Sequence, residues 1–243
     1  MHHWRQVASV PLVELRALSP ACGAPGTETV QRFLASAYDS AEAVLENLSN
    51  IRELRRQQGT GDIRGRLPAN EEDLLRAAIV FTGAGLDATL KRLIRDTLPS
   101  LLELKTQAHD KFEAFAAGRL GTGEVADTRV IARYLTSANP RQRLIDDYVY
   151  ELTGSSLQSA EEVQMAAGAL GIDDAQLRQR IGGLRDLFVA RNEISHELDL
   201  QRPERQGDRG RRTRSIGPTK SLCHEGLEVG QLIINAVGGM LSE

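Results

Sequence analysis

Three polar side chains that could carry out acid and base chemistry lie close together, at Arg191, Asn192 and His196. A histidine with its ordinary pKa of about 6.5 can take up or release a proton near neutral pH. An arginine guanidinium can hold two oxygens of one phosphate group at the same time. Asn192 could hold the phosphate or orient the imidazole of His196. This set of groups therefore suits chemistry on a phosphate ester.

The residues before these three side chains form a helical pattern. Apolar residues recur at three- and four-residue steps, which is typical of an amphipathic helix, at Leu177, Ile181, Leu184 and Phe188. Asp173 or Asp174 can cap its N-terminus, and the same face leads to Arg191. In an ideal helix, residues five apart differ by about 140° around the axis, so Arg191 and His196 converge only if the last turn unwinds. We therefore expect a motif at a helix end.

A simpler explanation for these residues is purely structural. Arg191 would then be a surface residue of the helix. His196 would be favoured near the C-terminus because a cation interacts well with that end of the helix dipole.

The sequence Arg-Asn-x-x-x-His at 191–196 resembles the signature of the HEPN superfamily. The resemblance is strongest over 70–98 and 184–199 and is closest to the RiboL-PSP-HEPN type. It implies an all-α helical bundle and a metal-independent endoribonuclease. The 2′-OH of RNA would attack the phosphate and leave 2′,3′-cyclic phosphate and 5′-OH ends. It also implies a homodimer that joins two copies of the motif in a composite active site.

The resemblance further implies a cellular role and a possible partner. Such an enzyme would act as a toxin or a phage-defence effector, with an antitoxin or a defence-system protein as partner. One HEPN branch, controlled by a companion nucleotidyltransferase, has Tyr two residues after the His. Leu198 occupies that position here, so this mode of control is not expected.

Asp87 is the fourth candidate catalytic residue, after Arg191, Asn192 and His196. It interrupts an apolar helix expected from Leu74 to about Leu98, and its Leu-Asp-Ala context matches an acidic residue found in many HEPN sequences. A buried carboxylate costs several kcal/mol unless it is paired, so we expect Asp87 to pair with Arg191. The alternative is that Asp87 points to solvent. Glu193 and Ser195 are lesser candidates.

A basic loop is expected directly after the motif, over 200–217. The stretch Gln201 to Lys220 carries seven positive and two negative charges, a net of +5, without apolar periodicity. We expect it to be flexible and to attract RNA phosphates, because phosphate contacts supply most nucleic-acid affinity. The alternative is a solvated surface. The candidate RNA-binding residues are Arg202, Arg205, Arg209, Arg211, Arg212 and Arg214.

The rest of the chain predicts one all-α domain over 1–243. Aromatic residues make up only 4% of a chain rich in Ala, Leu, Arg and Glu, which favours helices. Residues 1–26 form an N-terminal extension, and Pro218 can begin the last helix. Extra short helices are expected between about 118 and 172. Long helices are expected over Val30–Leu54 and Leu74–Leu98, and Pro99 begins either a new helix or a kinked continuation of the second one. Farther along, a turn at Asn139-Pro140 precedes the next helix, and Ser159 caps another.

Composition and missing motifs limit the other possibilities. A hydrophobic content of 41% can form a core without metals or disulfides, and Cys22 and Cys223 are expected to be ordinary buried thiols. No phosphate-binding glycine loop, metal-ligand motif or membrane span is found, so we expect no cofactor, no metal, no membrane contact and a cytoplasmic protein. The rival function is a non-catalytic HEPN-like helical module that binds a nucleotide or a protein partner.

Overall fold

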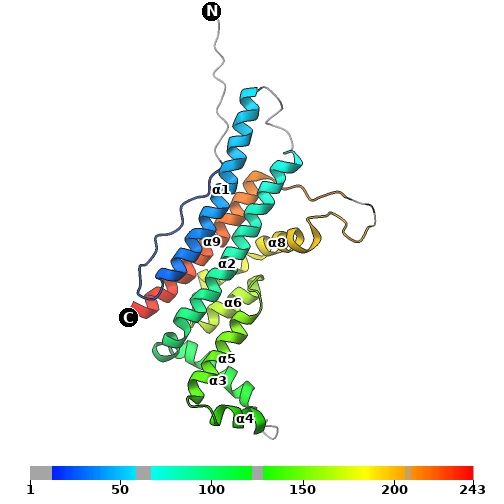
Figure 1. Cartoon of the computed structure of the whole chain (residues 1–243). Helices are drawn as coiled ribbons and strands as arrows, with labels where there is room; N and C mark the ends of the chain where they lie inside the picture. Colours follow the sequence, from blue (N-terminus) through cyan, green and yellow to red (C-terminus); the bar gives the residue numbers. More distant parts are fainter. Residues whose placement is uncertain (1–12, 59–66, 122–127, 206, 208, 243) are drawn as a thin grey trace, which may run out of the picture.

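The computed structural model describes residues 13–58, 67–121, 128–205, 207 and 209–242, and over these residues it confirms the predicted all-α class. Three long helices lie side by side and form the core: α1 (Glu28–Gln58), α2 (Ala69–Leu104) and α9 (Ile216–Ser242) (Figure 1). The motif helix α8 (Arg185–Glu197) packs mainly against α2. None of the described helices is long and apolar enough to cross a membrane.

The short helices between α2 and α8 form a second layer of packing. They are α3 (Thr106–Leu120), α4 (Thr128–Leu135), α5 (Pro140–Gly154), α6 (Ala160–Ala169) and α7 (Ala175–Gly182). In Figure 1, α3, α4 and α5 gather beyond the C-terminal end of α2. The Tyr148 ring of α5 lies 5.7 Å from the Phe112 ring and 4.7 Å from the Phe115 ring of α3, which joins these two helices.

Capping side chains mark several helix starts, at Ser159 and Asp174 as predicted and at Asn139, where only a turn was expected. The Asn139 side chain accepts a hydrogen bond from the Gln142 N–H, and the Ser159 hydroxyl accepts one from the Glu162 N–H. Asp174 accepts from the first turn of α7. These side chains satisfy N–H groups that have no acceptor inside the helix.

Of the two alternatives at Pro99, the continued helix is the one found. Pro99 lies inside α2, which continues to Leu104, because Leu101 and Leu102 remain buried beyond it. The expected single motif helix is wrong as well, since it is broken at Gly183 and Leu184 into α7 and α8. Apolar spacing continues across this break, although glycine itself disfavours helix.

The described part of the N-terminal extension, residues 13–26, forms a strap along α1 and α9 (Figure 1). The Val13 N–H donates to the Ser49 hydroxyl at 2.7 Å, and Val13 is buried. Farther along, the Cys22 N–H donates to the Asn235 side chain at 3.0 Å. Cys22 is exposed, contrary to prediction, whereas Cys223 is buried. Hydrogen bonds therefore hold the strap against both α1 and α9.

The basic loop is folded back on itself at its base, which differs from the flexible loop expected over 200–217. The Gln201 N–H donates to the Gly210 carbonyl and the Arg212 N–H donates to the Asp199 carbonyl, each at 2.8 Å. Leu200 and Arg211 form an isolated antiparallel bridge. The last helix also begins at Ile216, before Pro218. Backbone pairing therefore holds the two ends of this loop together.

Candidate active site

The motif helix is placed by its apolar face. Leu187, Phe188 and Ala190 of α8 are buried, and Arg191 follows them against α2. A Cβ atom on Gly83 of α2 would lie 3.0 Å from Cγ of Arg191, closer than ordinary contact. Glycine at position 83 therefore lets the Arg191 side chain lie directly on the α2 backbone.

The three motif side chains meet at the surface. Nη1 of Arg191 donates to Oδ1 of Asn192 at 3.0 Å and lies 3.4 Å from Nε2 of His196. Asn192 and His196 are exposed. The buried Nε of Arg191 has no hydrogen-bond partner among the described residues, and no carboxylate in that part of the chain pairs with this guanidinium. The aliphatic part of the Arg191 side chain thus packs on α2 at Gly83, while its guanidinium charge is available to an anionic ligand.

The end of α8 differs from a regular α-helix, in line with the expected relaxation of the last turn. The Leu198 N–H donates to the Glu193 carbonyl, five residues back rather than four, so this turn is widened. Leu198 and Asp199 then adopt left-handed backbone conformations, with φ of 53° and 59°. Such angles are unfavourable for residues other than glycine, although Asp tolerates them better than most. The chain reverses here and buries Asp199.

Asp199 lies at the centre of a group of buried and partly buried charges, which we call the Asp199 cluster: Arg76, Glu193, Asp199 and Arg214. The Asp199 carboxylate accepts hydrogen bonds from Nε of Arg76 at 2.7 Å and from Nε of Arg214 at 3.0 Å. Arg214 also donates to Glu193 of α8 at 2.8 Å. Arg76 itself is buried in α2. The Asp199 cluster therefore joins α2, the end of α8 and the segment that leads into α9.

The two arginines decide the protonation state of Asp199. Burial alone would raise the pKa of this carboxyl, but hydrogen bonds from Arg214 and Arg76 outweigh that effect, and the pKa of Asp199 is lowered. The carboxylate is therefore charged at neutral pH. It gives the two arginines a shared counter-charge, in addition to Glu72 and Asp73 beside Arg76 and Glu193 beside Arg214.

The expected pairing of Asp87 with Arg191 is not found. Oδ1 of Asp87 accepts a hydrogen bond from the Leu157 N–H at 2.6 Å, and Oδ2 pairs with Lys91 at 3.0 Å. Both carboxylate oxygens are thus occupied by the loop between α5 and α6 and by the next turn of α2. Asp87 is partly buried as expected. Its carboxylate holds that loop against α2 and does not contact Arg191.

Three of the six predicted RNA-binding arginines are already paired within the chain. Arg211 pairs with Asp73 at 2.6 Å, Arg212 pairs with Glu193 at 3.2 Å, and Arg214 belongs to the Asp199 cluster. Their charge is largely neutralised by these carboxylates. Glu193, a lesser catalytic candidate, is occupied by Arg212 and Arg214, whereas Ser195 is exposed.

The remaining three arginines of the loop differ from this paired set. Arg202, Arg205 and Arg209 are exposed, and their side chains have no carboxylate partner among the described residues. They lie in the loop that projects beyond α8 (Figure 1). These three side chains are the available phosphate contacts of the basic loop.

Sequence reasoning did not single out the residues that hold the motif in place. Arg76 follows Leu74 and Leu75 in an apolar run. A charged side chain in such a run requires a partner, because burying an unpaired charge is costly. That signal could have identified Arg76 as a positioning residue. No such signal marks Gly83, because its role is to leave room for Arg191, which lies far away in the sequence.

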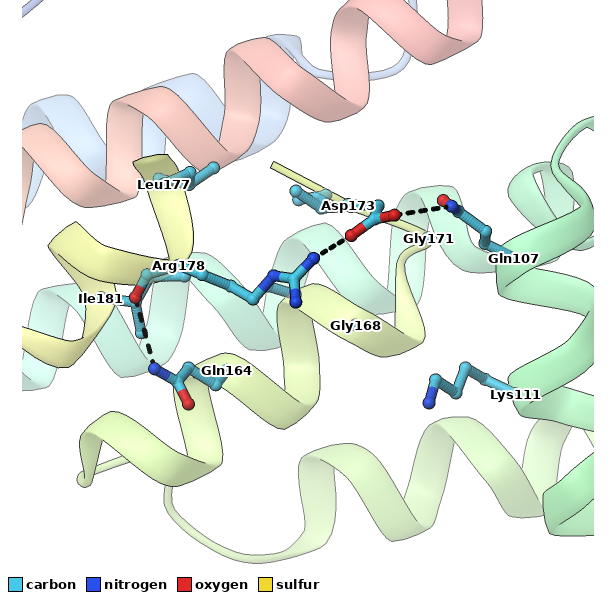
Figure 2. Close-up of a pocket in the computed structure, with 11 residues that line it drawn as sticks. Gln107, Lys111, Gln164, Gly168, Gly171, Asp173, Leu177, Arg178 and Ile181 are labelled. Carbon is cyan, nitrogen blue, oxygen red and sulfur yellow. Dashed lines mark hydrogen bonds and ion pairs between the residues drawn. The ribbon is translucent and has the colours of Figure 1, made fainter. Parts of the chain in front are cut away.

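A second polar site lies away from the motif, in a cavity of about 300 Å³ between α3, α6 and α7 (Figure 2). There Asp173 accepts from the Gln107 amide at 3.2 Å and also pairs with Arg178. Lys111 lines the same cavity from α3. Across the described ranges, no three His, Cys, Asp or Glu residues form a group that could hold a metal ion.

Comparison of this chain with protein-family models, with curated proteins and with solved structures finds no match.

The Asp199 cluster leads to a stability prediction. Asp199→Asn should lower the free energy of unfolding by about 3 kcal/mol at pH 7, because the buried Arg76 and the partly buried Arg214 lose the carboxylate that they share and keep only their partners Glu72, Asp73 and Glu193. The pKa of Asp199 is lowered in the folded state, so its stabilisation is complete above the ordinary value of 3.8 and is lost as pH falls below it. Urea denaturation from pH 7 to pH 3 measures both effects.

Asp110→Asn provides the matched control, since Asp110 is exposed on α3 and forms no ion pair in the described residues. It should leave the free energy of unfolding within about 0.5 kcal/mol of the original. Equal stability of the two variants at pH 7, or a difference between them that grows as the pH falls, would contradict the role assigned to Asp199.

Proposed function

We propose that the protein is a metal-independent endoribonuclease of HEPN type. The observation that carries this proposal is the 3.4 Å approach of the Arg191 guanidinium to the His196 imidazole, with no carboxylate paired to that guanidinium in the described residues. An arginine held for structure alone would gain stability from an acidic partner. Arg191 instead offers its charge at an exposed surface beside a group that can transfer protons.

The proposed reaction uses the side chains of this motif. One His196 imidazole takes the proton from the 2′-OH of RNA, whose oxygen attacks the adjacent phosphorus. A second imidazole, in its protonated form, gives a proton to the departing 5′-oxygen. Arg191 stabilises the negative charge that develops on the phosphate, and Asn192 orients Arg191 through their hydrogen bond. The products are a 2′,3′-cyclic phosphate and a 5′-OH.

A homodimer supplies the second imidazole. Each chain has a single histidine in its motif, whereas the reaction requires a base and an acid at the same time. A two-fold axis beside the exposed motif would bring two copies of His196 and Arg191 together. The exposure of His196 supports this arrangement, because the ring is accessible to a second chain.

The proposed setting is the cytoplasm, where such an enzyme would act as a toxin or as a phage-defence effector with an antitoxin or a defence-system protein as partner. The rival function is a non-catalytic module in which Arg191 and Asn192 bind a nucleotide or a protein partner without chemistry. Binding of RNA without cleavage would favour this rival.

The first prediction concerns cleavage. The purified chain should cut single-stranded RNA in the presence of EDTA and leave cyclic phosphate ends. His196→Ala should reduce the rate by about 10²-fold to 10⁴-fold, the usual contribution of general acid and base catalysis. His109→Ala is the matched control, since His109 lies on α3 and pairs with Glu113 at 3.4 Å. A rate that is unchanged by His196→Ala, or abolished by EDTA, would contradict the mechanism.

The second prediction concerns assembly. Light scattering should give the mass of a dimer at concentrations where the chain is active, because each composite site requires two motifs. Activity per chain should fall on dilution as the dimer dissociates. A monomer that retains full activity would show that one motif is sufficient and would exclude the composite site.

The third prediction concerns the basic loop. Replacing Arg202, Arg205 and Arg209 by Ser should flatten the dependence of log RNA affinity on log salt by up to about 2 units, because each phosphate contact on a single strand contributes about 0.7. The measurement uses a His196→Ala background so that the RNA stays intact. The control replaces Arg32 of α1, Arg119 of α3 and Arg133 of α4, which are also exposed and have no ion pair in the described residues. Equal slopes for the two triple variants would mean that RNA does not contact this loop.

A further inference from the structure

A cavity of about 560 Å³ opens where the strap passes the start of α9, and we call it the strap cavity. Its volume lies within the range of about 300 to 1,000 Å³ that is typical of small-molecule sites. Arg16 lines it from the strap and Gly183 from the turn before α8. The side chains that α9 contributes are Lys220, Ser221, Leu222, His224 and Glu225.

The charges around the strap cavity favour an anion. Arg16 and Lys220 both line it, and neither side chain has an ion-pair partner in the described part of the chain. Its acidic residue, Glu225, is already engaged by Arg180 through two hydrogen bonds of 2.9 Å. Gly217 belongs to the first turn of α9, where backbone N–H groups lack acceptors within the helix. The net charge of the wall is therefore positive.

His224 provides an independent indication of a ligand. Its Nδ1 atom is buried and has no hydrogen-bond partner among the described residues. Buried polar atoms in folded proteins nearly always have a partner, because an unpaired one loses its hydration without compensation. His224 also lines the strap cavity. Rotation of its ring toward the cavity would let Nδ1, in the tautomer that carries a proton there, donate a hydrogen bond to an oxyanion.

The strap holds the backbone around Arg16 in place before any ligand binds. On one side of it, the Leu15 N–H donates to Glu42 of α1 at 2.7 Å. On the other side, the Ser19 N–H donates to Glu228 of α9 at 2.9 Å. The backbone at Arg16 is therefore anchored at two nearby points, so little backbone entropy is lost when Arg16 binds a ligand.

We propose that the strap cavity binds a phosphate group through Arg16, Lys220 and His224. Two cationic side chains and a ring N–H match the several acceptor oxygens of phosphate. The cavity is larger than one phosphate ion, so the group would belong to a phosphorylated small molecule or to a nucleotide of an RNA strand. The site does not include Arg191 or His196, and it stands whether or not the protein cleaves RNA.

Calorimetric titration of the full chain with inorganic phosphate tests this site. The chain should bind one phosphate, and Arg16→Gln, Lys220→Gln and His224→Leu should each raise the dissociation constant at least about tenfold. Lys111→Gln is the matched control, because Lys111 lines the separate cavity of Figure 2 and the charge change is the same. It should change the constant less than about twofold. Thermal melting shows whether each variant folds, and the exposed Arg16→Gln variant remains informative if His224→Leu does not.

Two results would overturn the proposal. One is the absence of saturable phosphate binding by the original chain. The other is an equal effect of Lys111→Gln and Lys220→Gln, which would mean that phosphate responds only to overall charge.

Binding of single-stranded RNA to the His196→Ala chain then identifies the source of the phosphate. If Lys220→Gln weakens RNA binding as much as phosphate binding, the cavity holds a phosphate of the strand. If RNA binding is unaffected while phosphate binding is lost, it holds a free phosphorylated ligand. Both results support the site. A chain that binds phosphate but no RNA would contradict the proposed ribonuclease function and leave this inference intact.

Discussion

The buried carboxylate of Asp199 between Arg76 and Arg214 is the interaction on which the placement of the motif depends. Removing three charged groups from water is costly, and the cost is offset only while all three keep their hydrogen bonds. The arrangement is therefore specific as well as stabilising. It requires the backbone to reverse at Leu198 and Asp199 with positive φ angles, and that reversal ends α8 at Glu197, one residue after the motif histidine.

Local features of the chain could be predicted well, because their causes are local. Ser159 and Asp174 cap their helices through hydrogen bonds to residues two or three positions ahead, so the spacing in the sequence is sufficient. The approach of Arg191 to His196 at a helix end was also accessible from helical geometry. Pro99 left two alternatives open, a new helix or a continued one, because the choice between them does not depend on local sequence alone. Its local cost of about 3 kcal/mol is exceeded by burial of the apolar residues around it, which a local rule does not count.

Features that depend on distant partners could not be predicted. Asp87 required a partner, as the buried position suggested, but nothing in the sequence indicates that the Leu157 N–H supplies it from 70 residues away. The same holds for the basic loop, where six arginines look alike in sequence. Only the folded positions of Asp73 and Glu193 separate the paired arginines from those that remain available to a ligand.

The strap has a consequence for the order in which the chain can fold. Its Ser19 N–H is bound to Glu228, 209 residues later, and α9 is synthesised after every other described helix. Contacts of such long sequence separation form slowly, and N-terminal segments emerge from the ribosome first. α1 and α2 can pair early, but the strap must wait for α9. A nascent chain that stops before α9 would thus leave the apolar sides of α1 and α2 uncovered, and it would be a substrate for chaperones or proteases.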